Sequence, residues 1–353
     1  MTPEVSAIVV SHRSAAEAAR CVVSLAGGFA QERIAGEVVL VDCGSGEEEA
    51  ALLREVPADR YVPLPENRGY SGGVNAGLAQ ARGARLLLSN ADVVFSPGSI
   101  APLLDAIAEP RVGAAAPLST WDTEGRVRLP PGYAPGLFRD AAQLLAGLFP
   151  ALDRRRFASF ARETLRLWER GGSVPHLSGA VLAARREVFD AAGRFDERFP
   201  FEYEETEWED RVRSKGFDLL FVPEARVHHL WAVSSSRNPE SGARRVTSER
   251  LYRLRRYGRA ATALLERAAG FPRPAPAATR LSEPRVAARP DAVLALSPNP
   301  SGFPFACADL SRDFRVPDEV QAGLLPGLWY LTVFRKADGR SLERFVWEAR
   351  REL

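Results

Sequence analysis

The sequence has little cysteine and no long apolar run. Its three cysteines, Cys21, Cys43 and Cys307, are scattered, which excludes a disulfide framework and a zinc pattern and suits a reducing compartment. No stretch approaches the roughly 18 apolar residues that a membrane-spanning helix needs. The N-terminus has no basic segment followed by an apolar run, so we expect no signal peptide and a cytoplasmic protein.

A strong charge of one sign is missing too. The 47 basic residues nearly balance the 45 acidic ones, for a net charge of +2. We therefore expect no nucleic-acid partner, whereas peripheral membrane contact and a homodimer are left open. With 353 residues the chain is long enough for two domains.

The first half of the chain alternates strand-like and helix-like segments. Residues 5–10, 38–41 and 85–88 are short apolar runs, and 15–25 is Ala-rich with helical spacing. This alternation predicts an α/β fold with a mixed, mostly parallel sheet and helices on both faces. Polar residues follow each run, and ligands bind beyond the carboxyl ends of strands in such sheets.

Two amphipathic helices are predicted within residues 121–175. Their apolar faces are Phe138, Ala141, Leu145 and Leu148 in the first, and Phe157, Phe160, Ala161, Thr164 and Trp168 in the second. We interpret 121–175 as a helical insertion on the acceptor side of a domain that spans residues 1–270.

A second, smaller domain is expected after a linker at 271–282, whose first half is rich in Pro and Ala. Residues 283–353 contain four strand-like runs, and the turn at 337–340 predicts a hairpin between the last two. We expect a small all-β, sandwich-like module. Its aromatic residues are typical of a core, with a glycan-binding platform as the alternative.

Asp42 ends the second apolar run and leads into a Gly-Ser-Gly turn. A carboxylate there can accept hydrogen bonds from a nucleobase or a ribose hydroxyl. An equally weighted interpretation is a capped turn with Ser45 as the N-cap of a helix.

Residues 66–77 place four glycines and two asparagines before an Ala-rich helix. Such a segment can lay backbone N–H groups and a helix N-terminus against an anion or sugar. It lacks the Lys of a Walker A loop and does not follow the first strand as a dinucleotide fingerprint does. A structural turn is the alternative.

Two further segments carry groups able to bind a cation or a proton. Asp92 follows the strand at 85–88, and the adjacent His228 and His229 are half of the four histidines. The acidic segment 201–215 reads mostly as a solvated helix with favourable i,i+4 pairs. Glu204 and Glu205 stand at its beginning, where clustered like charges raise one another's pKa, as suits a general base.

Taken in order, eight segments resemble the family-2 glycosyltransferases with a GT-A fold, especially rhamnosyltransferase-like bacterial members. The segments are residues 9–13, 41–45, 66–77, 88–92, 178–180, 193–197, 203–208 and 223–229. Each alone is weak, but their order and spacing make a chance match improbable. The resemblance covers roughly residues 4–260 and leaves the C-terminal module outside.

The resemblance implies a role for each matching residue. The implied residues that bind the nucleotide sugar are Ser11, His12, Asp42, Ser45, Asn67, Gly69, Gly72, Gly73, Asn75, Asn90 and Asp92. Gly179, Trp208 and Trp231 would lie on the acceptor side, and Asp92 and His229 would hold a divalent metal, Mn or Mg. Glu205, with Glu204, would be the catalytic base.

The resemblance thus implies an enzyme of the hexosyltransferase type (EC 2.4). The donor would be a UDP-, dTDP- or GDP-sugar, and the acceptor the hydroxyl of a glycan, a lipid-linked saccharide or another molecule. Glu205 stands where the family has Asp, His12 where Asn is common, and Asn90 where the metal motif often begins with Asp. The alternatives are a decayed protein that only binds its ligand and, less favoured, a nucleotidyltransferase.

Overall fold

The computed structural model describes residues 3–132, 135–146, 149–230, 241–269, 277–302 and 304–349. Their contacts divide the chain into two compact units: Met1–Ser119 with Gly171–Tyr252, and Thr120–Arg170 with Arg253–Leu353. These boundaries differ from the predicted ones. The predicted insertion lies, up to Arg170, with the C-terminal module instead of with the N-terminal domain, because its side chains share the C-terminal core.

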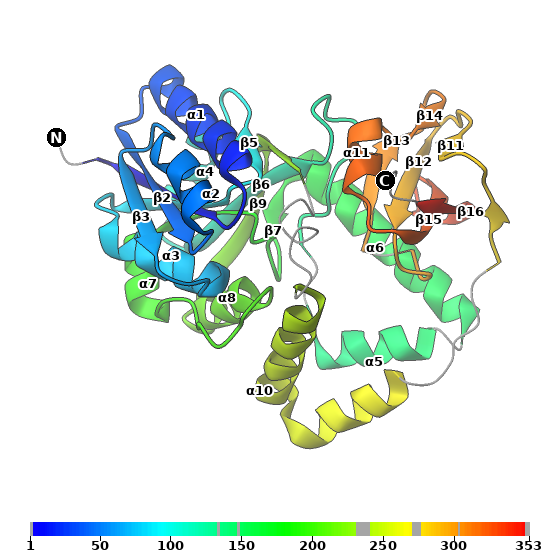
Figure 1. The fold of residues 1–353 in the computed structure, drawn as a ribbon. Helices are drawn as coiled ribbons and strands as arrows, with labels where there is room; N and C mark the ends of the chain where they lie inside the picture. Colours follow the sequence, from blue (N-terminus) through cyan, green and yellow to red (C-terminus); the bar gives the residue numbers. More distant parts are fainter. Residues whose placement is uncertain are drawn as a thin grey trace. The chain divides into compact units, whose positions relative to one another are not determined.

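The first unit is built on a mixed sheet in the order β3-β2-β1-β4-β8-β6-β9-β5, with β7 paired to β9 (Figure 1). Its strands are β1 Val5–Ser11, β2 Gly36–Cys43, β3 Arg60–Leu64, β4 Arg85–Asn90, β5 Val93–Phe95, β6 Val112–Thr120, β7 Gly172–Ser173, β8 Val181–Arg185 and β9 Asp218–His229. Strands β3, β2, β1 and β4 are parallel, and β8 runs antiparallel to β4. The α/β class and the mixed, mostly parallel N-terminal half are confirmed.

Helices cover both faces of this sheet (Figure 1). They are α1 Ala15–Glu32, α2 Glu47–Arg54, α3 Gly69–Gln80, α4 Ile100–Ala108, α7 Arg186–Ala192 and α8 Glu204–Ser214. In β1, Val5, Ala7 and Val9 belong to the core shared with α1 and α4, whereas alternate residues face α3. Both faces are buried, which is why β1 does not alternate apolar with charged residues.

The second unit holds a five-stranded sheet in the order β10-β16-β15-β12-β13 and a two-stranded ribbon of β11 and β14. Its elements are α5 Leu137–Ala146, α6 Pro150–Arg170, β10 Thr279–Arg280, β11 Arg285–Val286, β12 Ala292–Ser297, β13 Ala306–Asp309, β14 Phe314–Arg315, α11 Asp318–Gly323, β15 Gly327–Arg335 and β16 Ser341–Ala349. The predicted hairpin is present, with Gly339 at a φ of 67° in its turn.

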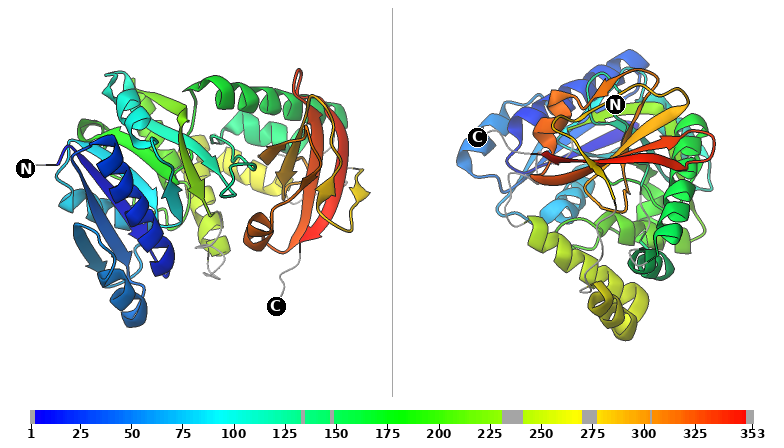
Figure 2. Two further views of the ribbon diagram at one scale, coloured as in Figure 1. Left: turned by 90° about the horizontal axis from the view of Figure 1, so that it is seen from above. Right: turned by 90° about the vertical axis from the view of Figure 1, so that its right-hand side faces the viewer.

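Side chains alternate between the two faces of this C-terminal sheet. On one face, Trp329, Leu331 and Val333 join a core with Trp121 and α11. On the other, Phe334 meets Phe157 of α6 edge to face at 5.6 Å, and Figure 2 shows α6 alongside the strands. The module is therefore a sheet covered by a helix, not an all-β sandwich, and the core interpretation of these aromatic residues is confirmed by their burial.

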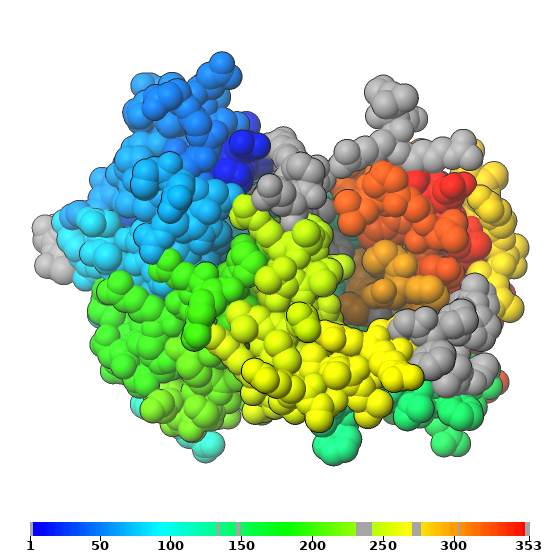
Figure 3. All heavy atoms as spheres, turned by 60° about the horizontal axis from the view of Figure 1, so that its bottom comes forward, coloured from blue at the N-terminus to red at the C-terminus, as the bar shows by residue number. Residues whose placement is uncertain are grey.

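Some of the predicted helical faces are exposed. Phe138 and Leu145 of α5 are 89% and 49% exposed, whereas Phe157 and Ala161 of α6 are fully buried as predicted. Helix α10, Ser241–Ala269, lies at the surface (Figure 3), and the left-handed Gly258 interrupts its helical geometry. Within the described ranges, no helix combines the length and apolar character that crossing a bilayer requires.

Close packing of α3 on the sheet depends on missing side chains. A Cβ on Gly73 would lie 2.5 Å from Val10 Cγ1 and 2.7 Å from Cys43 Sγ, and one on Gly77 would lie 2.3 Å from Ile8 Cγ2. Real Cβ atoms do not approach so closely, so α3 keeps this distance from β1 and β2 only while these positions are glycine.

We predict that Gly73→Ala lowers the free energy of unfolding by about 1–3 kcal/mol, because the overpacking outweighs the gain in helix propensity. Gly27→Ala in α1 is the control, since a Cβ there meets nothing within 4 Å. Urea unfolding of both variants measures the difference. An equal stabilisation of both would contradict the packing argument.

Candidate active site

A cavity of about 400 Å³ opens in the first unit at the carboxyl ends of β1, β2 and β4. The predicted residues that line it are His12, Asn67, Gly69, Asn90, Asp92, Gly179, Glu204, Glu205 and His229. Residues that are far apart in sequence converge here because β1 pairs with β2 on one side and with β4 on the other. The sheet therefore places the loops after these strands at one edge.

Asp92 and His229 lie next to each other in the cavity. Strand β5 pairs antiparallel with β9 so that Val93 faces His229, and Leu230 donates its N–H to the Asp92 carbonyl at 3.0 Å. Asp92 Oδ1 is 3.3 Å from His229 Nε2, and both side chains are less than 10% exposed.

This pair fits a divalent cation. Neighbouring ligands of an octahedral ion with bonds of about 2.1 Å lie roughly 3 Å apart, and carboxylate oxygen with imidazole nitrogen is a donor set that such ions accept. Across the ranges that the structure describes, no group of three or more His, Cys, Asp or Glu side chains is arranged around a common point. Two protein side chains would leave the remaining positions of such an ion to water or to another ligand.

Glu204 and Glu205 begin α8 and reach the cavity from a strained turn. Glu202 and Tyr203 before them have φ values of 58° and 68°, a left-handed conformation that costs non-glycine residues about 1–2 kcal/mol each. One oxygen of each carboxylate, Oε2, is buried without a hydrogen-bond partner. Burial, and next the charge of Glu205, raise the pKa of Glu204 well above its ordinary value.

Gly179 makes room for the side chain of Glu205. A Cβ on Gly179 would lie 2.8 Å from Glu205 Cγ and 3.1 Å from its Cδ. Tyr70 holds the same backbone, since its hydroxyl donates to the Gly179 carbonyl at 3.3 Å. Any larger residue at 179 would displace the Glu205 carboxylate.

A buried pair, His176 with Glu209, fixes the loop before Gly179 onto α8. The His176 Nδ1 contacts the Glu209 carboxylate, which also accepts the N–H of Leu177 at 3.2 Å. His176 Nε2 lies 3.3 Å from the Thr206 hydroxyl. Burial lowers the pKa of His176, but the Glu209 carboxylate outweighs it and the net pKa is raised.

His12 lines the cavity and is held by a hydrogen bond to the backbone. Its Nδ1 lies 2.9 Å from the Cys43 carbonyl, which makes Nδ1 the protonated nitrogen of the neutral ring. Burial is the main cause that lowers the pKa of His12. A neutral imidazole can stack on a base, or accept a hydrogen bond through Nε2.

Three predicted nucleotide ligands are buried and are not among the residues that line the cavity. Asp42 accepts the N–H of Ser45 at 3.0 Å and the Tyr61 hydroxyl at 2.9 Å. Ser45 Oγ accepts the N–H of Arg13, and Ser11 Oγ lies 3.0 Å from Ser14 Oγ. The N-cap of α2 is Gly46, so the interpretation of Ser45 as N-cap is wrong.

Helix α3 already begins at Gly69, so the glycine-rich segment is largely helix and not a loop before one. Gly72 packs on the Arg68 side chain and Gly73 on the sheet. Asn75 donates to the Phe195 carbonyl at 2.9 Å and to Glu197 at 3.0 Å. These contacts give Gly72, Gly73 and Asn75 packing roles, and none of the three lines the cavity. Their contact with a nucleotide sugar stays a prediction.

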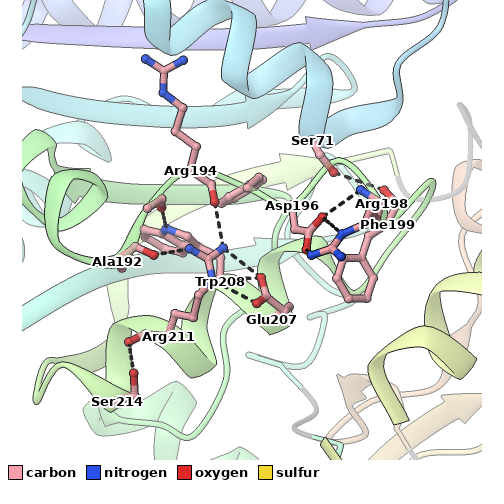
Figure 4. Close-up of polar contacts among 12 residues, drawn as sticks. Ser71, Ala192, Arg194, Asp196, Arg198, Phe199, Glu207, Trp208, Arg211 and Ser214 are labelled. Atoms are coloured by element: carbon pink, nitrogen blue, oxygen red, sulfur yellow. Dashed lines mark hydrogen bonds and ion pairs between the residues drawn. The ribbon is translucent and has the colours of Figure 1, made fainter. Parts of the chain in front are cut away.

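Trp208 is not an acceptor contact, and this prediction is corrected. Its ring is fully buried, stacks on Phe189 at 4.6 Å, and donates its N–H to the Gly193 carbonyl at 2.9 Å. Figure 4 shows Trp208 beside Arg211, whose guanidinium donates hydrogen bonds to the Arg194 carbonyl and the Glu207 carboxylate. Trp208 ties α8 to α7 and its C-terminal loop. Trp231 lies outside the described residues.

The structure adds residues to the cavity that we did not predict, above all Tyr70, Glu202 and Arg244. Arg244 comes from α10, and its charge acts on His12. Among the described residues that line the cavity, Arg244 is the one arginine or lysine, so it supplies a permanent positive charge there. Nothing in the local sequence distinguishes it from its neighbour Arg245, because its position follows from where α10 packs.

The fold and the cavity define an α/β enzyme with its site at the carboxyl edge of a sheet. Residues 6–193, more than half of the chain, match the model of glycosyl transferase family 2. The chain belongs to this family, and it is a glycosyltransferase.

Relatives from bacteria agree with this assignment. The chain is 33% identical over 256 residues to the N-acetylglucosaminyl-diphospho-decaprenol L-rhamnosyltransferase of two strains of Mycobacterium tuberculosis, covering 68% of this chain and 80% of the relative. It is 31% identical over 105 residues, 29% of each protein, to the succinoglycan biosynthesis protein ExoO of Rhizobium meliloti (strain 1021). The predicted resemblance is thus confirmed.

Two solved structures are more distant. The structure of GalNAc-T7 with UDP, GalNAc and Mn²⁺ has a TM-score of 0.46 and 20% identity, over 65% of this chain and 43% of that one. The mannosyltransferase PcManGT of Pyrobaculum calidifontis, in complex with GDP-Man and Mn²⁺, has a TM-score of 0.44 and 16% identity, over 76% and 80%.

We predict that Glu204→Gln makes the protein progressively more stable than the wild type as the pH rises. The folded wild type keeps a proton on Glu204 where the unfolded chain has released it. Glu204 therefore costs the wild type no stability below about pH 4.5. As the pH rises from there through the raised pKa, the free energy of unfolding of the wild type falls. Urea unfolding of both proteins between about pH 5 and pH 9 measures the difference. A difference that stays constant would contradict a raised pKa.

Proposed function

We propose that this glycosyltransferase moves a sugar from a nucleoside diphosphate sugar to an acceptor hydroxyl by direct displacement. The carrying observation is that Glu204, Glu205, Asp92 and His229 line one cavity, with a buried, unpartnered oxygen on each of the two glutamates. A buried carboxylate oxygen without a partner is unfavourable unless a ligand supplies a proton or a hydrogen bond.

Glu205 is the proposed base. Its Oε2 removes the proton from the acceptor hydroxyl, whose oxygen attacks the anomeric carbon on the face opposite the diphosphate. The new glycosidic C–O bond forms as the C–O bond to the diphosphate breaks, so the product is inverted at that carbon. The methylene that distinguishes Glu205 from Asp lies along Gly179, which is how a longer base fits.

Glu204 is proposed to support this base. Because burial favours its protonated form, Glu204 does not add a second negative charge beside Glu205. It retains an O–H that can donate to the acceptor or to Glu205.

Asp92 and His229 are proposed to hold Mn²⁺ or Mg²⁺, which when bound would neutralise charge on the diphosphate. Asp92 would supply a carboxylate oxygen and His229 its Nε2. Arg244 and His12 would bind the nucleotide side of the donor, with Arg244 pairing to phosphate oxygens. The backbone around Asn67 and Gly69 would approach the donor at the beginning of α3.

The acceptor is proposed to be a lipid-linked saccharide in a bacterial glycan pathway. The support is the mycobacterial relative, whose name specifies a diphospho-decaprenol-linked acceptor. Such an acceptor would bring the protein to the cytoplasmic face of a membrane.

The test of this function is a donor screen. UDP-, dTDP- and GDP-sugars are incubated with the full chain, with and without manganese, and both donor binding and release of nucleoside diphosphate are measured. Release from one donor class supports the proposal. Binding without release in every case would favour the alternative of a decayed, ligand-binding protein.

We predict that Glu205→Gln lowers the rate of sugar transfer by about 10²–10⁴-fold, while donor affinity stays within a few-fold of wild type. Glu207→Gln is the matched control on the same helix, because the Glu207 carboxylate pairs with Arg211 outside the cavity. Wild-type turnover by Glu205→Gln would remove Glu205 from the reaction.

We predict that Asp92→Asn weakens donor binding in the presence of manganese, by about tenfold or more, because a neutral amide is a poor ligand for a hard cation. Without metal, wild type and variant should bind alike. Titration calorimetry under both conditions checks this. Equal affinities with metal present would rule out Asp92 as its ligand.

We predict that Arg244→Gln lowers affinity for the nucleoside diphosphate by about tenfold, whereas affinity for the parent nucleoside is unchanged. Arg245→Gln, one residue along the same helix and outside the cavity, should leave both affinities unchanged. A loss of nucleoside binding in Arg244→Gln would instead indicate damage to the cavity wall.

A further inference from the structure

The second unit contains a cavity of its own, with a volume of about 1150 Å³. It lies between α6 and the face of the C-terminal sheet that carries Val293 of β12 and Cys307 of β13. All residues that line it belong to this unit. The proposed transferase chemistry uses none of them.

Helix α6 presents three arginines to this cavity. Arg162, Arg166 and Arg170 follow one another at spacings of four, so they lie along one face of the helix, and all three line the cavity. Like charges at i,i+4 repel one another and weaken a helix. Glu163 offsets part of this repulsion through its ion pair with Arg166. The remaining repulsion favours an anion in front of the helix.

The opposite wall is cationic as well. Arg126, Arg128, Arg312 and Lys336 line it, and the whole lining has seven basic side chains against three acidic ones, Glu163, Glu169 and Asp309. Some of these charges are paired, Arg126 with Asp122 and Lys336 with Asp309. The guanidinium of Arg128 instead lies over the Trp168 ring, 6.0 Å from its centroid.

The fold holds this wall in place. Arg128 forms a two-way backbone bridge with Cys307, each N–H donating to the other's carbonyl at 2.8 Å, so the segment before α5 extends the edge of the sheet beyond β13. Trp168 is 5% exposed and donates its N–H to the Leu129 carbonyl at 3.2 Å. The guanidinium therefore rests on a fixed indole, which limits its freedom before any ligand binds.

We propose that this cavity binds an anionic saccharide, whose phosphate or carboxylate groups pair with the arginines of α6 and with Arg128. Arginine suits both anions, because its planar fork can donate two parallel hydrogen bonds to either. The volume is that of a ligand much larger than a single phosphate ion. The hydroxyls of Ser159 and Ser311 and the carboxylate of Glu169, also in the lining, are partners for sugar hydroxyls.

The test compares two double variants of the full chain by titration calorimetry at low salt. Arg128→Gln with Arg162→Gln removes two charges from the cavity. Arg255→Gln with Arg259→Gln removes two charges from the exposed surface of α10 in the same unit. The probes are trigalacturonic acid, glucose 1-phosphate and the neutral maltotriose.

We expect wild type and the α10 variant to bind at least one anionic probe, and the cavity variant to bind it about tenfold or more weakly. The stronger anionic probe identifies phosphate or carboxylate as the recognised group. Maltotriose, which carries no charge, should bind to none of the three proteins. No binding of either anionic probe to wild type, or an equal loss in both variants, would overturn the proposal.

A single substitution in a loop, Arg312→Gln, repeats the test where unfolding of the double variant is a concern. Far-UV circular dichroism establishes that each variant is folded. Weakened anion binding by folded Arg312→Gln supports the site, and unchanged binding by both folded cavity variants contradicts it.

Discussion

The antiparallel pairing of β5 with β9 is the constraint on which the active site depends. It sets Asp92 beside His229, although 136 residues separate them along the chain, and the backbone bond from Leu230 to Asp92 fixes their register. A shift of one residue would turn each side chain to the opposite face of the sheet. The proposed cation site is therefore a property of sheet register more than of either residue.

The glutamates opposite this pair are held by a different device. Their turn is strained at Glu202 and Tyr203, and such strain persists only where surrounding structure enforces it. Phe201 donates its N–H to Ser248 Oγ at 3.3 Å, and the Tyr203 ring lies 5.4 Å from that of Tyr252. The first half of α10 thus holds the turn, while the pair of His176 and Glu209 holds the loop that faces it.

The alternation of strands and helices predicted the α/β fold, and the polar motifs after the strands predicted many of the residues that line the cavity, because strand ends in such a sheet share one edge. It failed where a residue's role depends on which way a helix faces. Gly73 and Gly77, at a spacing of four, pack on β1 and β2, which is the mark of a close-packed helix face and not of a phosphate loop. Trp208 and Val212 have the same spacing on α8 and form its buried stripe.

Contacts across long stretches of chain were beyond the sequence patterns. Arg244 differs from Arg245 only in the direction that α10 gives it. The affiliation of residues 120–170 with the C-terminal sheet depends on pairs such as Trp121 with Trp329 and Phe157 with Phe305, which no local periodicity reveals.

The interleaved order of the two units has a consequence for dissecting the protein. Because the second unit draws on two separate stretches of chain, ending the chain near residue 270 would not release a clean N-terminal fragment. Helix α6 would remain, with Phe157 stripped of Phe305 and Phe334, and its apolar face would then meet water and favour aggregation. A minimal catalytic fragment has to lose residues 120–170 as well, with a short peptide joining Ser119 to Gly171.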